Sequence, residues 1–318
     1  MGMIEGFGIQ GLQMLLVVAL APGLTGLVRR IKARLMRRRG ASILQPYRDI
    51  ARLMRKEVVL AENASWLFRA APYLIFAATW VAAALVPTFA TGLQFSWTAD
   101  LIALVALLGS ARFFLALAAL DVGTGFGGLG ASREMMFASM AEPAMLLTVF
   151  VIALVAGSTQ LSTVVQAFSG PTVGLRVSLG MAAIALIIVA IAENGRIPVD
   201  NPSTHLELTM VHEAMVLEYS GRHLAMIELA AALKLLLYVS LIACLFAPWG
   251  IAREGDGPAA LAFGALAYVG KLAVGGSALA AFEISVAKMR IFRVPSFLGF
   301  ALMLGLLGTL LLFVSRTL

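Results

Sequence analysis

The sequence has 318 residues, of which 61% are hydrophobic and only 13% are charged, and its mean hydropathy is +0.94. A soluble core of this length cannot bury so much apolar surface, so we predict an all-α integral membrane protein that forms one polytopic domain over residues 1–318. The formal net charge is +7, but the chain contains no solvated basic domain, which excludes nucleic acid as a partner.

The apolar segments predict eight transmembrane helices, each near the roughly 20 residues that a bilayer requires. Residues 1–8 carry one acid and no base, which argues against a cleaved secretory signal, so the first span is expected to be retained. The predicted spans lie at about 9–28, 70–90, 99–121, 139–157, 174–192, 223–247, 259–283 and 296–316.

A basic segment, residues 29–62, follows the first span and holds eleven Lys or Arg residues against three acids. Within it, Gln45-Pro46 opens a segment whose apolar and basic residues separate at helical spacing, which predicts an interfacial amphipathic helix. The apolar residues are Ile50, Leu53, Met54 and Val58, and the basic ones are Arg48, Arg52, Arg55 and Lys56. This helix is either a lipid-facing anchor or a docking surface for a soluble partner, and the sequence leaves both possibilities open.

The glycine-rich segment 123–138 is predicted to be a loop between two spans. It lacks the GK[ST] ending of a P-loop and follows a membrane helix rather than a strand, which argues against nucleotide binding. We expect its glycines to permit a tight turn and a close approach between helices.

An acidic insert, residues 193–222, separates two strongly apolar spans and is the leading candidate for a functional site. Its ionisable residues are Glu193, Asp200, Glu207, Glu213, Glu218, His205 and His212. Thr204 and Glu207 match a capping box, and Gly221 matches a left-handed cap, so a short helix is predicted over about 205–219. A purely structural role of this helix is the alternative.

Positive charges predict the topology of the chain. With the N-terminus outside, the inner loops hold eighteen Lys or Arg residues and the outer loops three, which predicts a cytoplasmic (inner) membrane protein with a cytoplasmic insert. The remaining three bases, Arg112, Lys234 and Lys271, lie within spans and are expected to face the bundle interior beside acids or water. Their candidate acidic partners are Asp121, Glu142, Glu228 and Glu283.

The chain is not expected to hold a redox centre or a metal. A single cysteine, Cys244, cannot ligate an iron–sulfur cluster or form an intramolecular disulfide, and it is predicted to lie in the core. The three histidines lack the spacing of a zincin helix. Any electron transfer would therefore occur in partner subunits.

Three segments together carry a family resemblance. They are Gly40–Glu57 with Gln45-Pro46, Gly130–Glu142 with Arg133, and Glu193–Gly221 with Glu207-Leu208 and Glu218-Tyr219-Ser220-Gly221. Taken in this order, they resemble subunit 1 of respiratory complex I over most of the chain. Five finer features look closer to the membrane subunit of formate hydrogenlyase and related group 4 nickel–iron hydrogenases, also called hydrogenase-4 component C. They are Tyr47-Arg48-Asp49, Glu134, Ser203, His205 and Glu213.

The resemblance implies a membrane anchor, lying in a bacterial or archaeal cytoplasmic membrane, that couples a soluble redox arm to proton or ion translocation. It implies the hydrogenase large and small subunits, an iron–sulfur subunit and antiporter-like membrane subunits as partners, besides membrane lipid. The nickel–iron centre and iron–sulfur clusters are expected in those partners, with no cofactor on this chain. In the family, acids matching Glu142, Glu207 and Glu218 line the path that links redox chemistry to ion movement.

Our hypothesis is that this chain is such a coupling subunit without catalytic residues of its own. The predicted proton path consists of Glu142, Glu193, Asp200, Glu207, Glu213 and Glu218, helped by Lys234, Lys271 and Glu283 deeper in the bundle. The predicted docking residues are Arg48, Arg52, Arg133 and Arg196. The alternatives are a quinone-binding subunit with an apolar tunnel between the first and sixth spans, a stand-alone cation transporter, and an inert anchor.

Overall fold

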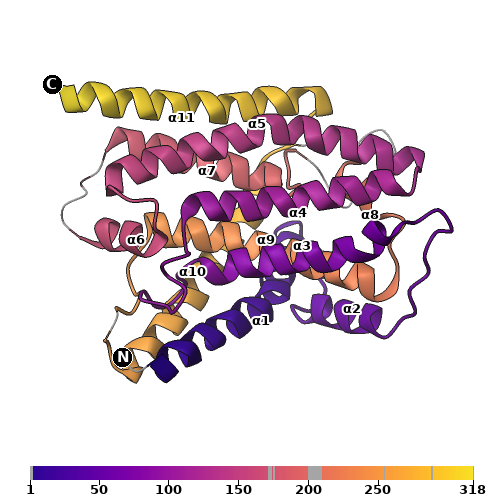
Figure 1. Cartoon of the computed structure of the whole chain (residues 1–318), viewed down its shortest axis with the longest axis horizontal. Helices are drawn as coiled ribbons and strands as arrows, with labels where there is room; N and C mark the ends of the chain where they lie inside the picture. Colours follow the sequence, from indigo (N-terminus) through magenta and orange to yellow (C-terminus); the bar gives the residue numbers. More distant parts are fainter. Residues whose placement is uncertain are drawn as a thin grey trace.

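The computed structural model describes residues 3–170, 174, 176–199, 210–253, 255–287 and 289–317. Helices dominate this part of the chain, and its only β pairings are two isolated bridges, Ala90 with Ala252 and Asp100 with Gln160. The long helices lie side by side, with both termini at one end of the molecule and the short α2 and α8 at the other (Figure 1). The prediction of an all-α fold is confirmed.

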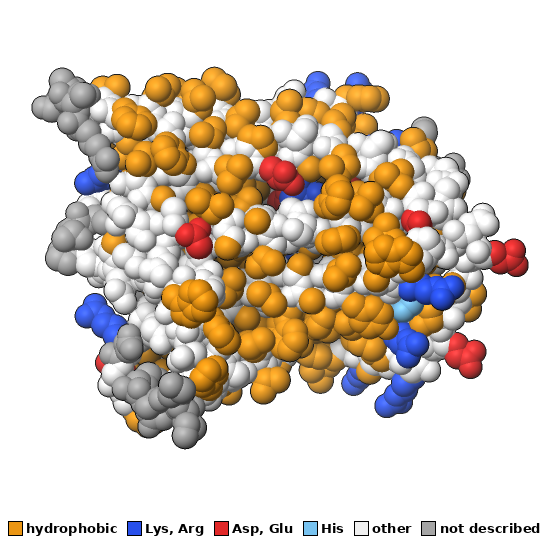
Figure 2. Space-filling model, viewed as in Figure 1, with side chains coloured by type: hydrophobic (Ala, Val, Ile, Leu, Met, Phe, Trp, Pro, Cys, Tyr) orange, Lys and Arg blue, Asp and Glu red, His pale blue; other side chains and the backbone are white. Residues whose placement is uncertain are grey.

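Eight helices overlap the eight predicted spans, although α1 and α5 are longer than predicted. They are α1 (Met3–Leu35), α3 (Trp66–Leu85), α4 (Leu101–Asp121), α5 (Gly125–Ala156), α7 (Val177–Glu193), α9 (Gly221–Phe246), α10 (Pro258–Ser285) and α11 (Val294–Thr317). Within the described residues, seven are long and apolar enough to cross a membrane, and α7 is a shorter apolar helix. The surface along these helices is largely hydrophobic (Figure 2). The chain is a multi-pass membrane protein.

Three short helices and one 3₁₀ turn complete the described fold. They are α2 (Gln45–Met54), α6 (Leu161–Ser169), α8 (His212–Val216) and η2 (Ile291–Arg293). The amphipathic helix is confirmed as α2, which packs on α1 and α9 and has proline in its first turn, as predicted. It ends at Met54, so Val58 lies beyond the helix rather than on its apolar face.

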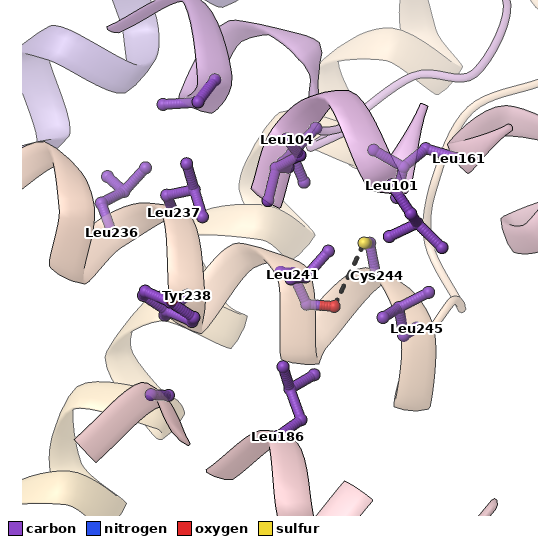
Figure 3. Packing of buried hydrophobic residues seen from close by; sticks show 14 of the residues in the cluster. Leu101, Leu104, Leu161, Leu186, Leu236, Leu237, Tyr238, Leu241, Cys244 and Leu245 are labelled. Carbon is purple, nitrogen blue, oxygen red and sulfur yellow. Dashed lines mark hydrogen bonds between the residues drawn. The ribbon is translucent and has the colours of Figure 1, made fainter. Parts of the chain in front are cut away.

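The core surrounds α9, the most buried of the spans named above. Leucines of α4, α6 and α7 converge on one segment of α9 (Figure 3). Cys244 is buried among them and donates a weak hydrogen bond to the carbonyl of Leu241 at 3.2 Å, which confirms its predicted place in the core. At the opposite side of the bundle, α11 packs along α5 and α7 (Figure 1).

The glycine-rich segment is helical, which corrects the loop prediction. Helix α5 begins at Gly125. Thr124 is its N-cap residue, and the Thr124 hydroxyl accepts a hydrogen bond from the Gly127 amide. Glycine weakens a helix in isolation, but here the absence of side chains lets the helix pack tightly. Backbone carbonyls of Ala119 and Val211 lie where side chains at Gly127 and Gly130 would stand. The expected role of these glycines in close approach is therefore confirmed.

The acidic insert differs from its prediction. Helix α8 covers only His212–Val216, and residues on either side of it within 210–220 are not helical. Asp200, His205 and Glu207 lie outside the described residues, as does the predicted capping box. The turn at Gly221 is left-handed (φ +52°) as expected, but Gly221 begins α9 instead of ending a long loop helix.

Packing explains why the chain turns at Gly221. The carbonyls of Lys56 and Glu57 occupy the space that a side chain at Gly221 would need. Next to it, the Ser220 hydroxyl bonds to both the amide (2.8 Å) and the carbonyl (2.9 Å) of Val59. Tyr219 stacks on Phe68 with ring centroids 4.0 Å apart, and burial raises the pKa of its phenol. The segment after α2 is thus fastened to the start of α9.

We expect Gly221→Ala to destabilise the protein by about 2–5 kcal/mol, the sum of left-handed strain and overpacking against carbonyl groups. The measurement is thermal unfolding of the purified chain in detergent. Gly123→Ala is the matched control, because Gly123 is also left-handed (φ +72°) but nothing lies within 4 Å of its missing side chain. Equal losses in both variants would contradict the packing explanation.

Candidate functional site

Arg112 lies on α4, within a membrane-spanning segment, and only 6% of its side chain is exposed. A charged side chain at the centre of a bilayer costs about 2.5–3.5 kcal/mol, so it requires compensation. Three carboxylates provide it: the nitrogens of Arg112 lie 3.8 Å from Glu134, 3.2 Å from Glu142 and 2.5 Å from Glu193. The guanidinium therefore joins α4 to α5 and α7.

Glu193 extends this network to a fourth helix. It is the last residue of α7, its side chain is 4% exposed, and its second oxygen lies 3.0 Å from the ammonium of Lys234 on α9. One carboxylate thus bridges two cations from two helices. We call Arg112, Glu134, Glu142, Glu193 and Lys234 the Arg112 cluster.

The Arg112 cluster has more acids than bases. With all side chains ionised, three carboxylates and two cations leave a net charge of −1. Glu193 contacts both cations, whereas Glu134 and Glu142 each contact Arg112 alone. Glu142, with 44% of its side chain exposed, also reaches the surface of the bundle.

A cavity of about 90 Å³ adjoins the Arg112 cluster. Although Glu134 and Glu142 lie within ion-pair distance, the buried Nε and Nη1 atoms of Arg112 form no hydrogen bond to a described residue, and the 3.8 Å from Nε to Glu134 is too long for one. These donors therefore keep hydrogen-bonding capacity beside the cavity. The cavity wall includes Arg112, Glu134, Glu193, Lys234 and His212.

Two further cavities continue from this site toward α2. The second, about 400 Å³, shares Asn194, Gly195, His212 and Ala231 with the first. The third, about 210 Å³, lies between α1, α2 and α9 and shares Thr25, Arg29, Glu228 and Ala232 with the second. Of the residues common to the first two, His212 alone is protonatable. The three cavities form a series from the α2 end of the bundle to the Arg112 cluster.

Glu283 on α10 lies in the wall of the second cavity. Its carboxylate is buried and lies 2.8 Å from Lys32 of α1 and 3.4 Å from Arg196, which follows α7. Burial lowers the pKa of Arg196, and the attraction of Glu283 opposes this shift. This site has the opposite imbalance from the Arg112 cluster, with two cations for one carboxylate.

Comparison with known proteins places the chain in a family. A family model described as NADH dehydrogenase matches residues 9–314, nearly the whole chain. The chain belongs to the NADH dehydrogenase family. The resemblance to complex I subunit 1 inferred from three segments is thereby confirmed.

Three known proteins are similar to this chain in sequence. The chain is 34% identical over 284 residues to formate hydrogenlyase subunit 4 of Escherichia coli K12, covering 89% of this chain and 91% of that protein. It is 36% identical over 246 residues to hydrogenase-4 component C of the same strain, covering 76% of each. NADH-quinone oxidoreductase subunit 8 of Rhodothermus marinus is 29% identical over 211 residues, which are 65% of this chain and 61% of that one.

A solved structure shows the same fold. A chain of the membrane-bound sulfane sulfur reductase, an archaeal respiratory membrane complex, superposes with a TM-score of 0.80 at 20% identity. The match covers 96% of this chain and 99% of that one. The overall fold is therefore shared with this distant structure.

The structure brings some of the predicted site residues of this NADH dehydrogenase family member together and separates others. Glu142, Glu193 and Lys234 meet in the Arg112 cluster, whereas Glu213, Glu283 and Arg196 line the second cavity. Glu218 is exposed after α8, and Asp200 and Glu207 are outside the described residues. Their participation in a proton path stays a prediction.

The predicted docking residues divide in a similar way. Arg48 and Arg52 are exposed on α2, where Arg52 pairs with Asp49 at 3.1 Å. Arg133 instead donates a hydrogen bond to the carbonyl of Met210 at 2.8 Å, and Arg196 pairs with Glu283. A docking role of these four residues stays a prediction. Arg48 and Arg52 are better placed to bind a partner than Arg133 and Arg196, because they are exposed on α2.

Among the described residues, no carboxylate lies within ion-pair distance of Lys271, so the acidic partner that was one of its two expected surroundings is not found there. Its ammonium donates to the backbone carbonyl of Trp249, just beyond the C-terminal end of α9, at 2.5 Å. Lys234 also pairs with Glu193 rather than with Glu228 on its own helix. Helix rotation and tilt decide these partners, and hydropathy patterns do not specify either.

Sequence reasoning did not place Arg112, Glu134 and Lys32 in the candidate site. Arg112 had been recognised as an intramembrane base, which is the signal that could have made it the centre. Glu134 was not grouped with Glu142 because the glycine-rich segment was interpreted as a loop. In the structure, both residues belong to helix α5. For Lys32, one of many bases in the segment 29–62, the sequence provides no distinguishing signal.

We expect Glu193→Gln to destabilise the chain by about 3–5 kcal/mol, because it leaves Arg112 and Lys234 without their shared partner. The measurement is thermal unfolding in detergent. Adding Lys234→Met removes one orphaned cation, so the double variant should lose less than the sum of the single losses. The exposed Glu62→Gln should stay within about 0.5 kcal/mol of the unchanged chain. Strict additivity of the pair would show that the two side chains do not interact.

Proposed function

We propose that this chain is the membrane subunit of a hydrogenase-like respiratory complex and couples redox chemistry in partner subunits to proton movement. The observation that carries this proposal is the Arg112 cluster, in which three carboxylates share two cations around the buried Arg112 and Glu193. The names of its relatives, formate hydrogenlyase subunit 4 and hydrogenase-4 component C, support the setting. They also favour a subunit over a stand-alone transporter.

The three cavities supply the path from the α2 end to the Arg112 cluster. Charged walls and volumes of about 400 and 210 Å³ suit water, whose share of liquid volume is about 30 Å³ per molecule. A proton entering beside α2 would pass the Glu213–Glu283 region and reach His212 at the junction of the first two cavities. It would then bind at Glu134 or Glu142, where the negative excess lies.

Glu142 offers an exit from the bundle. It is half-exposed on α5, in a membrane-spanning helix whose outer surface is mostly apolar. Acidic side chains interrupt the hydrophobic face seen in Figure 2. A carboxylate in this position is unfavourable against lipid, which supports contact with a neighbouring membrane subunit. Antiporter-like subunits are the partners that we propose there.

Redox centres would reside elsewhere in the complex. The proposal assigns the nickel–iron centre and the iron–sulfur clusters to the hydrogenase large, small and iron–sulfur subunits, which would dock at the α2 end. The excess of bases in residues 29–62 supports placing that end in the cytoplasm, with the N-terminus outside the cytoplasmic membrane of a bacterium or archaeon.

A quinone-binding subunit is the second candidate. The observation that favours it is the cavity between α1 and α9, which are the first and sixth predicted spans. That cavity was expected to be apolar, but Arg29, Lys32, Glu213, Glu228 and Glu283 line its continuation. Such walls suit water and protons better than an isoprenoid chain, and proton coupling therefore stands first.

Glu142→Gln should lower coupled ion transport at least tenfold while the complex still assembles, because the amide cannot take up the mobile proton. The measurement is ion uptake into inverted membrane vesicles that contain the whole complex, together with its redox rate. Glu207→Gln, chosen from the sequence, is expected to behave in the same way.

Glu62→Gln is the control for this experiment, because Glu62 is exposed and distant from the Arg112 cluster in the sequence. Its transport should match that of the unchanged complex. Normal ion transport in Glu142→Gln would remove Glu142 from the path.

Reversing two exposed charges of α2, with Arg48→Glu and Arg52→Glu combined, should reduce co-purification of the soluble partner subunits about tenfold, because like charges would then face the partner. The measurement is the ratio of soluble to membrane subunits after mild solubilisation. Arg176→Glu, an exposed change before α7, is the control. The same loss in both variants would mean that α2 is not a docking surface.

A further inference from the structure

An apolar groove of about 720 Å³ runs between α7, α9 and α10. Along α9 and its C-cap its wall extends from Leu235 to Ala247, twelve steps of 1.5 Å, or about 18 Å. This is close to half of the roughly 30 Å hydrocarbon core of a bilayer. Gly270, Gly275 and Ala278 of α10 leave the groove open. Its length suits one membrane leaflet.

The charges that line the groove have one sign. Among the described lining residues, the only charged ones are Arg196 and Lys271, and none is an acid. Arg196 is compensated by Glu283 at 3.4 Å. For Lys271, the described part of the chain provides no carboxylate within ion-pair distance, and its recorded hydrogen bond goes to the neutral carbonyl of Trp249. Within the described residues, the positive charge at the Lys271 end of the groove is therefore not compensated by an ion pair.

Trp249 marks the same end as a membrane boundary. Its indole is 72% exposed, and it follows the last turn of α9. Tryptophan is enriched where hydrocarbon meets the head groups, and basic pockets between membrane helices attract anionic head groups. An apolar groove that spans one leaflet thus ends in a cation at head-group depth.

We propose that this groove binds an anionic phospholipid, with an acyl chain against α9 and α10 and the phosphate at Lys271. Charge complementarity selects the anionic head group, since no acid of the described lining repels it. The groove length selects an acyl chain over a peptide helix, which would have to cross both leaflets. The groove shares Asn194 and Arg196 with the second cavity, but the lipid proposal rests on the apolar wall and Lys271 and does not require a proton path.

The test uses the full-length chain, purified in mild detergent and titrated with phosphatidylglycerol or phosphatidylcholine of the same acyl length. Native mass spectrometry measures the fraction of each lipid bound. We expect phosphatidylglycerol to bind more tightly than phosphatidylcholine. Lys271→Gln should weaken phosphatidylglycerol binding about fivefold, the equivalent of about 1 kcal/mol per basic residue near a head group. Lys271→Arg should retain the preference.

Two further variants separate the groove from general surface charge. Arg253→Gln removes an exposed base in the connection between α9 and α10, outside the groove lining, and should leave lipid binding unchanged. Ala278→Phe fills the groove and should weaken binding of both lipids. Equal affinity of the unchanged chain for the two lipids would overturn the proposal. Equal losses in Lys271→Gln and Arg253→Gln would overturn it too, as would a partner helix photo-cross-linked from position 278 in the native complex.

Discussion

The buried guanidinium of Arg112 is the constraint on which the interior of this protein depends. A cation on a membrane-spanning helix needs carboxylates close by, and here they come from α5 and α7, while Lys234 of α9 shares one of them. These contacts fix the rotation of four helices relative to one another, which apolar packing alone specifies weakly in a bilayer. The glycines of α5 and the short helix α8 serve the same arrangement, because they let the acidic insert pack directly on α5.

The same electrostatics connect structure to function. The Arg112 cluster has one carboxylate more than its cations, and the Glu283 site has one cation more than its carboxylate. Adjoining cavities join the two sites, with His212 in the shared wall. In the proposed function, these cavities are the route by which a change at the α2 end would reach the Arg112 cluster.

The sequence predicted the fold better than the site, for physical reasons. Each span must satisfy its own backbone in lipid, so hydropathy alone located all eight helices. Glu193 was placed in the path, but its pairing with Arg112 and Lys234 depends on helix rotation, which a single sequence does not encode locally. Lys271 looked equivalent to Lys234 in the sequence, yet the end of α9 gives it a backbone carbonyl as its partner. The glycine-rich segment was misjudged because tertiary packing outweighs the low helix propensity of glycine.

Infrared difference spectroscopy of the intact complex, recorded before and during turnover at neutral pH, tests the central claim most directly. The account predicts a carbonyl band of a protonated carboxylic acid that changes during turnover and is removed by substituting Glu134 or Glu142. A spectrum in which every acid of the Arg112 cluster stays ionised throughout turnover would contradict it, because the cluster would then hold its negative excess without taking up a proton.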